Sequence, residues 1–389
     1  MYYLEKIYLD NASTTRPKTE VVDAMLPYLT DKYYNPSSLY SPSVQIKNEI
    51  ENARKTVADF IGAKAEEIYF TSSGSESNCW SIKGFCESCL KNDEIPMIVT
   101  TPIEHKSIIS CVENHEFVNC EYVKVDKDGM VDTDDLERIL KYYSKRKYTK
   151  YNILVSIQIA NNEIGTVQKI GKISNIVHEH NAILHMDAVQ AFGQISIRVD
   201  HMGIDILSAS GHKIGCPKGI GILYKKKSIE IEPLIYGSQM DSMRGGTENV
   251  PYIIGFAKAI ELKKRYVING CLDVVVKQHE FIKKLESIDC KLIGSRYCRI
   301  PNNINVMLPE GVGSEEMLYM LDMAGIYIST GSACNSHSVE PSYVLKAIGL
   351  TDEEAARCIR ITLPDDFDCG IIDKVICEIE KNIMLLKSE

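Results

Sequence analysis

The sequence predicts an α/β protein with a mostly parallel, seven-stranded sheet covered by helices. Short apolar segments alternate with stretches of helical hydrophobic spacing from about residue 65 onward, which is typical of strand–helix–strand units. The seventh segment follows the sixth too closely for a helical crossover, so we expect it to pair antiparallel. The expected strands are residues 68–71, 97–101, 122–125, 153–159, 183–187, 206–210 and 220–224.

A helix is expected before the sheet, with Ser41 as N-cap, Pro42 at the first helical position and Gly62 at its end. A long helix near residues 250–267 leads out of the sheet domain. A small α+β domain follows, with helices near 274–285, 315–324 and 371–386 and strands near 304–308 and 359–363. The chain has 389 residues and is 44% hydrophobic, which is enough for two cores. We expect a large domain over 15–255, a small domain over 256–389, and an N-terminal arm over 1–14.

Charge and cysteine content exclude several classes of protein. The net charge of −9 argues against direct binding of nucleic acid. No segment is apolar enough to cross a bilayer and no signal pattern opens the chain, so we expect a cytoplasmic protein that does not bind membranes. The 13 cysteines are interpreted as reduced thiols. Cys86 and Cys89 have metal-ligand spacing but no matching second pair, so we expect no metal site.

Lys213 follows the sixth expected strand and precedes a turn rich in glycine and proline. A lysine held there can be partly desolvated, which favours the neutral, nucleophilic amine of a Schiff-base lysine. Asp187 ends the neighbouring strand, and carboxyl ends of parallel strands meet at one crevice. A carboxylate near such a lysine suits the ring nitrogen of pyridoxal 5′-phosphate (PLP). An ordinary solvated lysine is the alternative for Lys213 taken alone.

Other candidate residues follow strands in the same way. Gly74 and Ser75 lie in a Ser/Gly-rich turn that opens a helix, which suits a phosphate, although a simple helix cap explains the turn equally well. Ser210 and His212 can also donate to a phosphate. His105 suits stacking on a flat cofactor and proton exchange, and Asn162 suits hydrogen bonding to a ligand, with capping and turn formation as the alternatives.

Cys334 and Arg360 are expected to act on the substrate. Cys334 lies among small, polar and turn-forming residues, which indicates an accessible thiol nucleophile rather than a core cysteine. Arg360 lies on an expected strand and can clamp a carboxylate with two hydrogen bonds, with an ordinary salt bridge as the alternative.

These motifs resemble the cysteine desulfurases of the class V aminotransferase family, which are PLP enzymes of fold type I. The resemblance runs nearly from end to end, through residues 8–15, 71–78, 104–105, 161–165, 187–190, 210–213, 244–247 and 331–334. It implies that Lys213 binds PLP covalently, Asp187 pairs with its ring nitrogen, Gln190 bonds its ring hydroxyl and His105 stacks on the ring. It also implies phosphate binding by Gly74, Ser75, Ser210 and His212, with Thr247 reaching in from the second subunit of a homodimer.

The same resemblance implies the reaction. Asn162 and Arg360 would hold the carboxylate of L-cysteine, Lys213 would remove the Cα proton, and the Cys334 thiolate would take the sulfur as a persulfide while L-alanine leaves. Residues 331–343 are similar to the branch that supplies sulfur to an acceptor protein, either an iron–sulfur scaffold or a tRNA-thiolating enzyme.

The chain departs from the family pattern in two places. Residues 237–242 lack the usual Glu-Arg pair, and an acidic Pro364-Asp365-Asp366 turn follows Arg360. Two alternatives stay open: another class V reaction, such as a selenocysteine lyase, a cysteine sulfinate lyase or a true aminotransferase, and a sulfur carrier or assembly platform with weak activity.

Overall fold

The central element of the computed structural model is a seven-stranded sheet. The structure describes residues 6–114, 119–146, 151–269, 271–330 and 341–388. The strand order is β2-β8-β7-β6-β5-β3-β4. Its strands are β2 (Ile68–Thr71), β3 (Ile95–Thr100), β4 (Asn119–Tyr122), β5 (Tyr151–Gln158), β6 (Ile183–Asp187), β7 (Ile206–Ser210) and β8 (Gly221–Lys225).

The expected strand directions are confirmed. Strand β8 pairs antiparallel with both β7 and β2, and the other neighbouring pairs are parallel. The prediction for β4 was wrong in position, because residues 122–125 were expected and the strand spans Asn119–Tyr122. This edge strand is half exposed, so its own side chains carry no apolar signal, whereas the buried Val123 just beyond it does.

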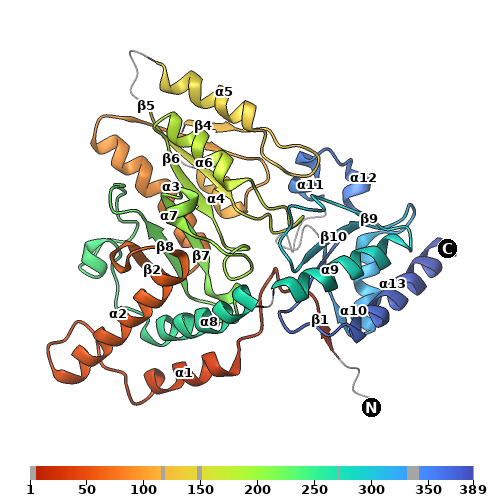
Figure 1. The fold of residues 1–389 in the computed structure, drawn as a ribbon, viewed down its shortest axis with the longest axis horizontal. Helices are drawn as coiled ribbons and strands as arrows, with labels where there is room; N and C mark the ends of the chain where they lie inside the picture. The colour runs from red at the N-terminus through yellow and green to blue at the C-terminus, as the bar shows by residue number, and fades with distance from the viewer. Residues whose placement is uncertain (1–5, 115–118, 147–150, 270, 331–340, 389) are drawn as a thin grey trace.

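Helices cover both faces of the sheet (Figure 1). Helices α3 (Gly74–Lys91) and α4 (Lys106–Glu113) pack on each other, as do α5 (Thr133–Ser144) and α6 (Ile170–Glu179), and a short α7 (Val199–Met202) precedes β7. Helices α1 (Thr19–Leu29) and α2 (Ser41–Ile61) pack against α8 (Val250–Asn269). The N-cap of α2 is Tyr40 rather than the expected Ser41, so Pro42 is the second helical residue. Gly62 ends the helix with φ 73°, as a left-handed cap.

A second, four-stranded sheet lies on the C-terminal side of the molecule, at the right of Figure 1. Its order is β12 (Ser329–Thr330), β13 (Cys358–Thr362), β10 (Asn303–Met307) and β9 (Lys291–Leu292). The surrounding helices are α9 (Cys271–Glu286), α10 (Ser314–Met323), α11 (Tyr343–Ala347), α12 (Asp352–Ala355) and α13 (Gly370–Ser388).

The N-terminal arm connects the two regions. Its strand β1 (Ile7–Tyr8) pairs in parallel with β11 (Ile326–Tyr327), and Lys18 N donates to Gly215 O beside the large sheet. The domain boundary near residue 255 stays a prediction. Among the described residues, no helix combines the length and apolarity that a membrane span needs.

Candidate active site

A cavity of about 250 Å³ lies at the carboxyl ends of β6 and β7. Segments that follow five strands (β2, β3, β5, β6 and β7) and the N-terminal arm contribute to its wall. The lining includes nine of the residues predicted from the sequence, namely Gly74, Ser75, His105, Asn162, Asp187, Gln190, Ser210, His212 and Lys213. The prediction that strand ends bring these distant segments together is therefore confirmed.

Lys213 is the last residue of a short 3₁₀ helix, Gly211–Lys213, that directly follows β7. Its Nζ donates to the backbone oxygens of Ala12 and Ser13 at 2.5 and 2.7 Å. Gln190 Nε2 donates to the same Ala12 oxygen at 3.1 Å. Two backbone oxygens of the N-terminal arm therefore accept hydrogen bonds from the lysine amine. These hydrogen bonds hold the Lys213 side chain at the wall of the cavity.

Asp187 is the last residue of β6 and is 5% exposed. Burial raises the pKa of its carboxyl group, while the neighbouring His105 and two hydrogen bonds oppose this effect. Asn78 Nδ2 donates to Oδ2 at 2.7 Å and Val189 N donates to Oδ1 at 2.8 Å. These neutral donors hold a carboxylate in the cavity without a direct ion pair.

His105 is the N-cap of α4, and its Nδ1 accepts from Ser107 N at 3.1 Å. Burial, and secondarily the positive charge of Lys213, lower the pKa of its imidazole, and the charge of Asp187 opposes this. The ring is therefore neutral at pH 7 with Nδ1 as acceptor. A neutral, flat ring at the cavity wall suits stacking better than charge pairing.

The turn between β2 and α3 forms the other end of the cavity. Ser73 caps α3, and its side chain accepts from Glu76 N. A Cβ on Gly74 would lie 2.5 Å from Val189 Cγ2, so only glycine keeps this backbone position open. Burial lowers the pKa of His212 to about 4, so it contributes a neutral hydrogen-bonding group.

These features fit PLP. The N-terminus of α3 favours a phosphate, Asp187 provides a buried carboxylate for a ring nitrogen, and Lys213 provides an amine for a covalent link. The Asn162 Oδ1 atom is buried and has no hydrogen-bond partner among the described residues, as expected for a group that awaits a ligand.

Arg360 lies beside the cavity but does not line it. Its Nη1 donates to Asn162 O at 3.0 Å, and its Nη2 donates to Asp10 Oδ1 at 2.8 Å and to Ser13 Oγ at 2.9 Å. Arg360 is 4% exposed, and its guanidinium forms an ion pair with Asp10 of the N-terminal arm. A substrate carboxylate would have to displace Asp10 to accept from Nη2, whereas Nε of Arg360 is buried and has no hydrogen-bond partner among the described residues.

Two further predicted residues remain, Thr247 and Cys334. Thr247 is exposed and lies outside the lining, and its role through a second subunit stays a prediction. Cys334 lies outside the described residues. Just after residues 331–340, Ser342 Oγ donates to the buried Glu163, and Tyr343 Oη donates to Glu104 O at 2.6 Å. Ser342 and Tyr343 are therefore fixed against the segments that carry Glu163 and Glu104.

Sequence reasoning assigned no role to Ser13, Asn78 or Ser107, which also line the cavity. Asn78 donates to both Asp187 and Ser107 Oγ, the latter at 3.0 Å. One signal was available: Asn78 lies one helical turn beyond Gly74, and so on the same face of the helix.

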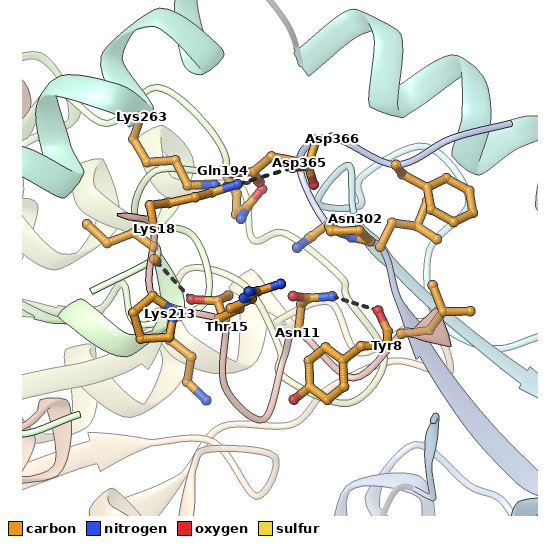
Figure 2. A pocket seen from close by; sticks show the side chains of 18 of the residues that line it. Tyr8, Asn11, Thr15, Lys18, Gln194, Lys213, Lys263, Asn302, Asp365 and Asp366 are labelled. Atoms are coloured by element: carbon orange, nitrogen blue, oxygen red, sulfur yellow. Dashed lines mark hydrogen bonds and ion pairs between the residues drawn. The ribbon is translucent and has the colours of Figure 1, made fainter. Parts of the chain in front are cut away.

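A second cavity, of about 680 Å³, shares Lys213 and the N-terminal arm with the first. Figure 2 shows Lys18, Lys263, Asp365 and Asp366 together along one wall. Lys263 Nζ contacts Asp365 Oδ1 at 2.6 Å and Lys18 Nζ contacts Asp366 Oδ2 at 3.3 Å. The acidic turn after Arg360 thus serves ion pairs in this larger cavity, and its acids do not line the smaller one.

The divergent loop after Gly237 has an unusual backbone. Met240, Asp241 and Ser242 have φ values of 48°, 56° and 65°, in the left-handed region that side chains other than glycine disfavour. Arg244, next in the loop, pairs with Glu76 of α3 at 3.1 Å. The loop is therefore tied to the start of α3 even without the usual Glu-Arg pair.

The aminotransferase class-V family model matches residues 7–363. The chain belongs to this family. This class-V chain is 42% identical over 363 residues to the cysteine desulfurase IscS of Dictyoglomus turgidum, covering 92% of this chain and 89% of that protein. It is 40% identical over 387 residues to the cysteine desulfurase IscS of Methanosarcina thermophila, covering 98% and 93%.

Solved structures agree with the class-V fold. A NifS-like protein matches with a TM-score of 0.88 and 31% identity, covering 98% of this chain and all of that chain. A NifS-like protein from Rickettsia africae matches with a TM-score of 0.85 and 32% identity, covering 97% and 99%. The expected α/β fold and family are confirmed.

Proposed function

We propose that this chain is a PLP-dependent cysteine desulfurase that converts L-cysteine to L-alanine and leaves the sulfur as a persulfide on Cys334. The observation that carries the proposal is the convergence of Lys213, Asp187 and the α3 turn on one cavity. Relatives named cysteine desulfurase, at about 40% identity over most of the chain, support it.

When bound, PLP supplies an electron sink that stabilises negative charge at the Cα of an amino acid. Lys213 would hold it covalently, Asp187 would face its ring nitrogen, Gln190 its hydroxyl group and His105 its ring face. Gly74, Ser75, Ser210 and His212 would hold its phosphate, and Thr247 of a second subunit would complete that site.

The substrate carboxylate would accept from the Arg360 guanidinium and the side-chain N–H of Asn162, because Arg360 lies against Asn162 beside the cavity. Lys213 Nζ, displaced by the substrate amine, would take the Cα proton. The Ala12 and Ser13 oxygens that now accept from Nζ keep the amine close to the point where it works.

The sulfur-transfer step needs no added oxidant. The Cys334 thiolate attacks the substrate sulfur, an S–S bond forms, and the Cβ–S bond breaks. Its electron pair ends at Cβ, which is protonated, and Cα regains the proton that Lys213 removed. One cysteine and one thiol therefore give one alanine and one persulfide.

We also propose a homodimer that works in the cytoplasm and passes sulfur to an acceptor protein, an iron–sulfur scaffold or a tRNA-thiolating enzyme. Exposed apolar side chains near the α1–α2 connection, such as Tyr33 at 73% and Leu39 at 95%, favour a covered surface there. The free thiols of the described cysteines suit a reducing compartment. Size measurement in solution tests the dimer, and a pull-down followed by a persulfide-transfer assay tests the acceptor.

The function is tested by incubating the PLP-loaded protein with L-cysteine and a thiol reductant, and by measuring alanine and sulfide together. We expect equal amounts of both from the parent protein and neither from Cys334→Ser, which should keep its PLP absorbance. A keto acid in place of alanine would overturn the proposal, and so would sulfide formation by Cys334→Ser at the parent rate.

A further inference from the structure

Two cysteines outside the cavity lie in direct contact across the α3–α4 interface. Cys79 is on α3 and Cys111 is on α4, and the Cys111 thiol donates to Cys79 Sγ over 3.5 Å. The two helices pack on each other along this contact. None of the roles proposed above uses either thiol.

The two thiols are unequal. The hydrogen bond from Cys111, helped by the charge of Lys83, lowers the pKa of Cys79 to about 7, and Cys79 is partly exposed. Cys111 is 8% exposed, and its hydrogen bond to Cys79 together with burial raises the pKa of its thiol. An accessible thiolate beside a protected thiol is the arrangement of a reactive cysteine and its resolving partner.

We propose that Cys79 and Cys111 form a redox modification site that takes hydroperoxides. The Cys79 thiolate attacks one peroxide oxygen, an S–O bond forms, the O–O bond breaks, and hydroxide or alkoxide leaves. The Cys111 thiol then attacks the Cys79 sulfur, an S–S bond forms, and the S–O oxygen leaves as water. The two thiols lose two electrons in total and the peroxide gains them.

Disulfide formation would affect the PLP cavity through Asn78. The two sulfurs must approach from 3.5 Å to about 2.05 Å, which requires a new side-chain rotamer of Cys79 or Cys111 or a shift of α3 against α4. Asn78, next to Cys79, donates to Asp187 from α3 and to Ser107 near the start of α4. We expect oxidation to disturb the support of Asp187 and therefore the PLP absorbance.

The test treats PLP-loaded protein with hydrogen peroxide and maps cysteine-containing peptides by mass spectrometry. We expect a linked Cys79–Cys111 peptide pair with a reversible change in PLP absorbance, and neither in Cys79→Ser nor in Cys111→Ser. The matched control is Cys86→Ser, because Cys86 is on the same helix but is fully buried, with its pKa raised to about 12.

A second readout does not depend on disulfide formation or on activity. In unmodified protein at pH 7, a thiol-alkylating reagent should modify Cys79 at least about ten times faster than Cys86. Linkage of Cys79 to a different cysteine, or equal alkylation rates for Cys79 and Cys86, would overturn the proposal. Both readouts report on these thiols whether or not the protein desulfurates cysteine.

Discussion

The two cavities that meet at Lys213 differ in how their charges are balanced. In the larger one, Lys263 and Lys18 are paired with Asp365 and Asp366. In the smaller one, Asp187 is held by the neutral donors Asn78 and Val189. An ion pair joins two segments of the chain, and its charges neutralise each other. A carboxylate that is held by neutral hydrogen-bond donors still carries its charge and can bind a cationic ligand group. We therefore propose the smaller cavity as the active site despite its size.

The prediction with the largest expected effect compares Lys213 of the smaller cavity with Lys18, which lines only the larger one. Lys213→Ala should lower alanine formation by at least about 10³-fold, because it removes both the covalent attachment and the proton acceptor. Lys18→Ala, at the wall of the larger cavity, should change the rate less than about twofold, because its ion pair is exposed. Steady-state alanine assays on both variants check this, and equal losses would contradict the division of roles.

Stability, in contrast to activity, should depend on an ion pair of the larger cavity. Asp365→Asn leaves the Lys263 ammonium buried and unpaired, so we expect a loss of about 3 kcal/mol in the free energy of unfolding. Asp366→Asn is the matched control, and its exposed pair should contribute less than about 1 kcal/mol. Urea unfolding measures both values. An equal effect of the two substitutions would show that the Lys263–Asp365 pair does not hold the cavity wall.

Asn78 tests the support of Asp187. Asn78→Ala removes a hydrogen bond to a charged group worth about 1.5–3 kcal/mol, so PLP affinity should fall by roughly 10–100-fold. Asn92→Ala, at the exposed end of the same helix, should leave affinity unchanged. Titration of the apoprotein with PLP, followed by visible absorbance, checks this, and unchanged affinity in Asn78→Ala would rule out the supporting role.

A further prediction concerns the pH dependence of stability. Burial raises the pKa of Glu163 to about 7 from an ordinary value near 4.5. The folded state then binds more protons than the unfolded state between these values, so this group lowers stability progressively as pH rises from about 4.5 to 7. Glu163→Gln should therefore gain stability relative to the parent at pH 7.5 compared with pH 5. Melting temperatures at both pH values measure this, and a pH-independent difference would contradict it.

Much of the site could be predicted from sequence because parallel strands deliver their carboxyl ends to one edge of a sheet. Lys213, His105 and Asn162 follow strands and Asp187 ends one, and local apolar runs reveal those strands. Such reasoning does not require knowledge of how distant segments pack.

The residues that were missed depend on long-range packing. The contact of Asp10 with Arg360 joins positions 350 residues apart, through an arm that has almost no regular structure of its own. Strand β4 was misplaced because its own side chains are half-buried or exposed and the buried Val123 lies just beyond it. The Cys79–Cys111 contact likewise depends on how α3 and α4 dock, which sequence spacing alone does not give.

The central claim is that Lys213 chemistry in the smaller cavity ends with sulfur on Cys334. A single-turnover reaction with ³⁵S-labelled L-cysteine, without reductant and followed by non-reducing peptide mapping, tests it most directly. We predict one alanine per subunit and the label on the Cys334 peptide. Alanine formation with the label elsewhere, or release of unbound sulfide without a labelled Cys334 peptide, would contradict the account.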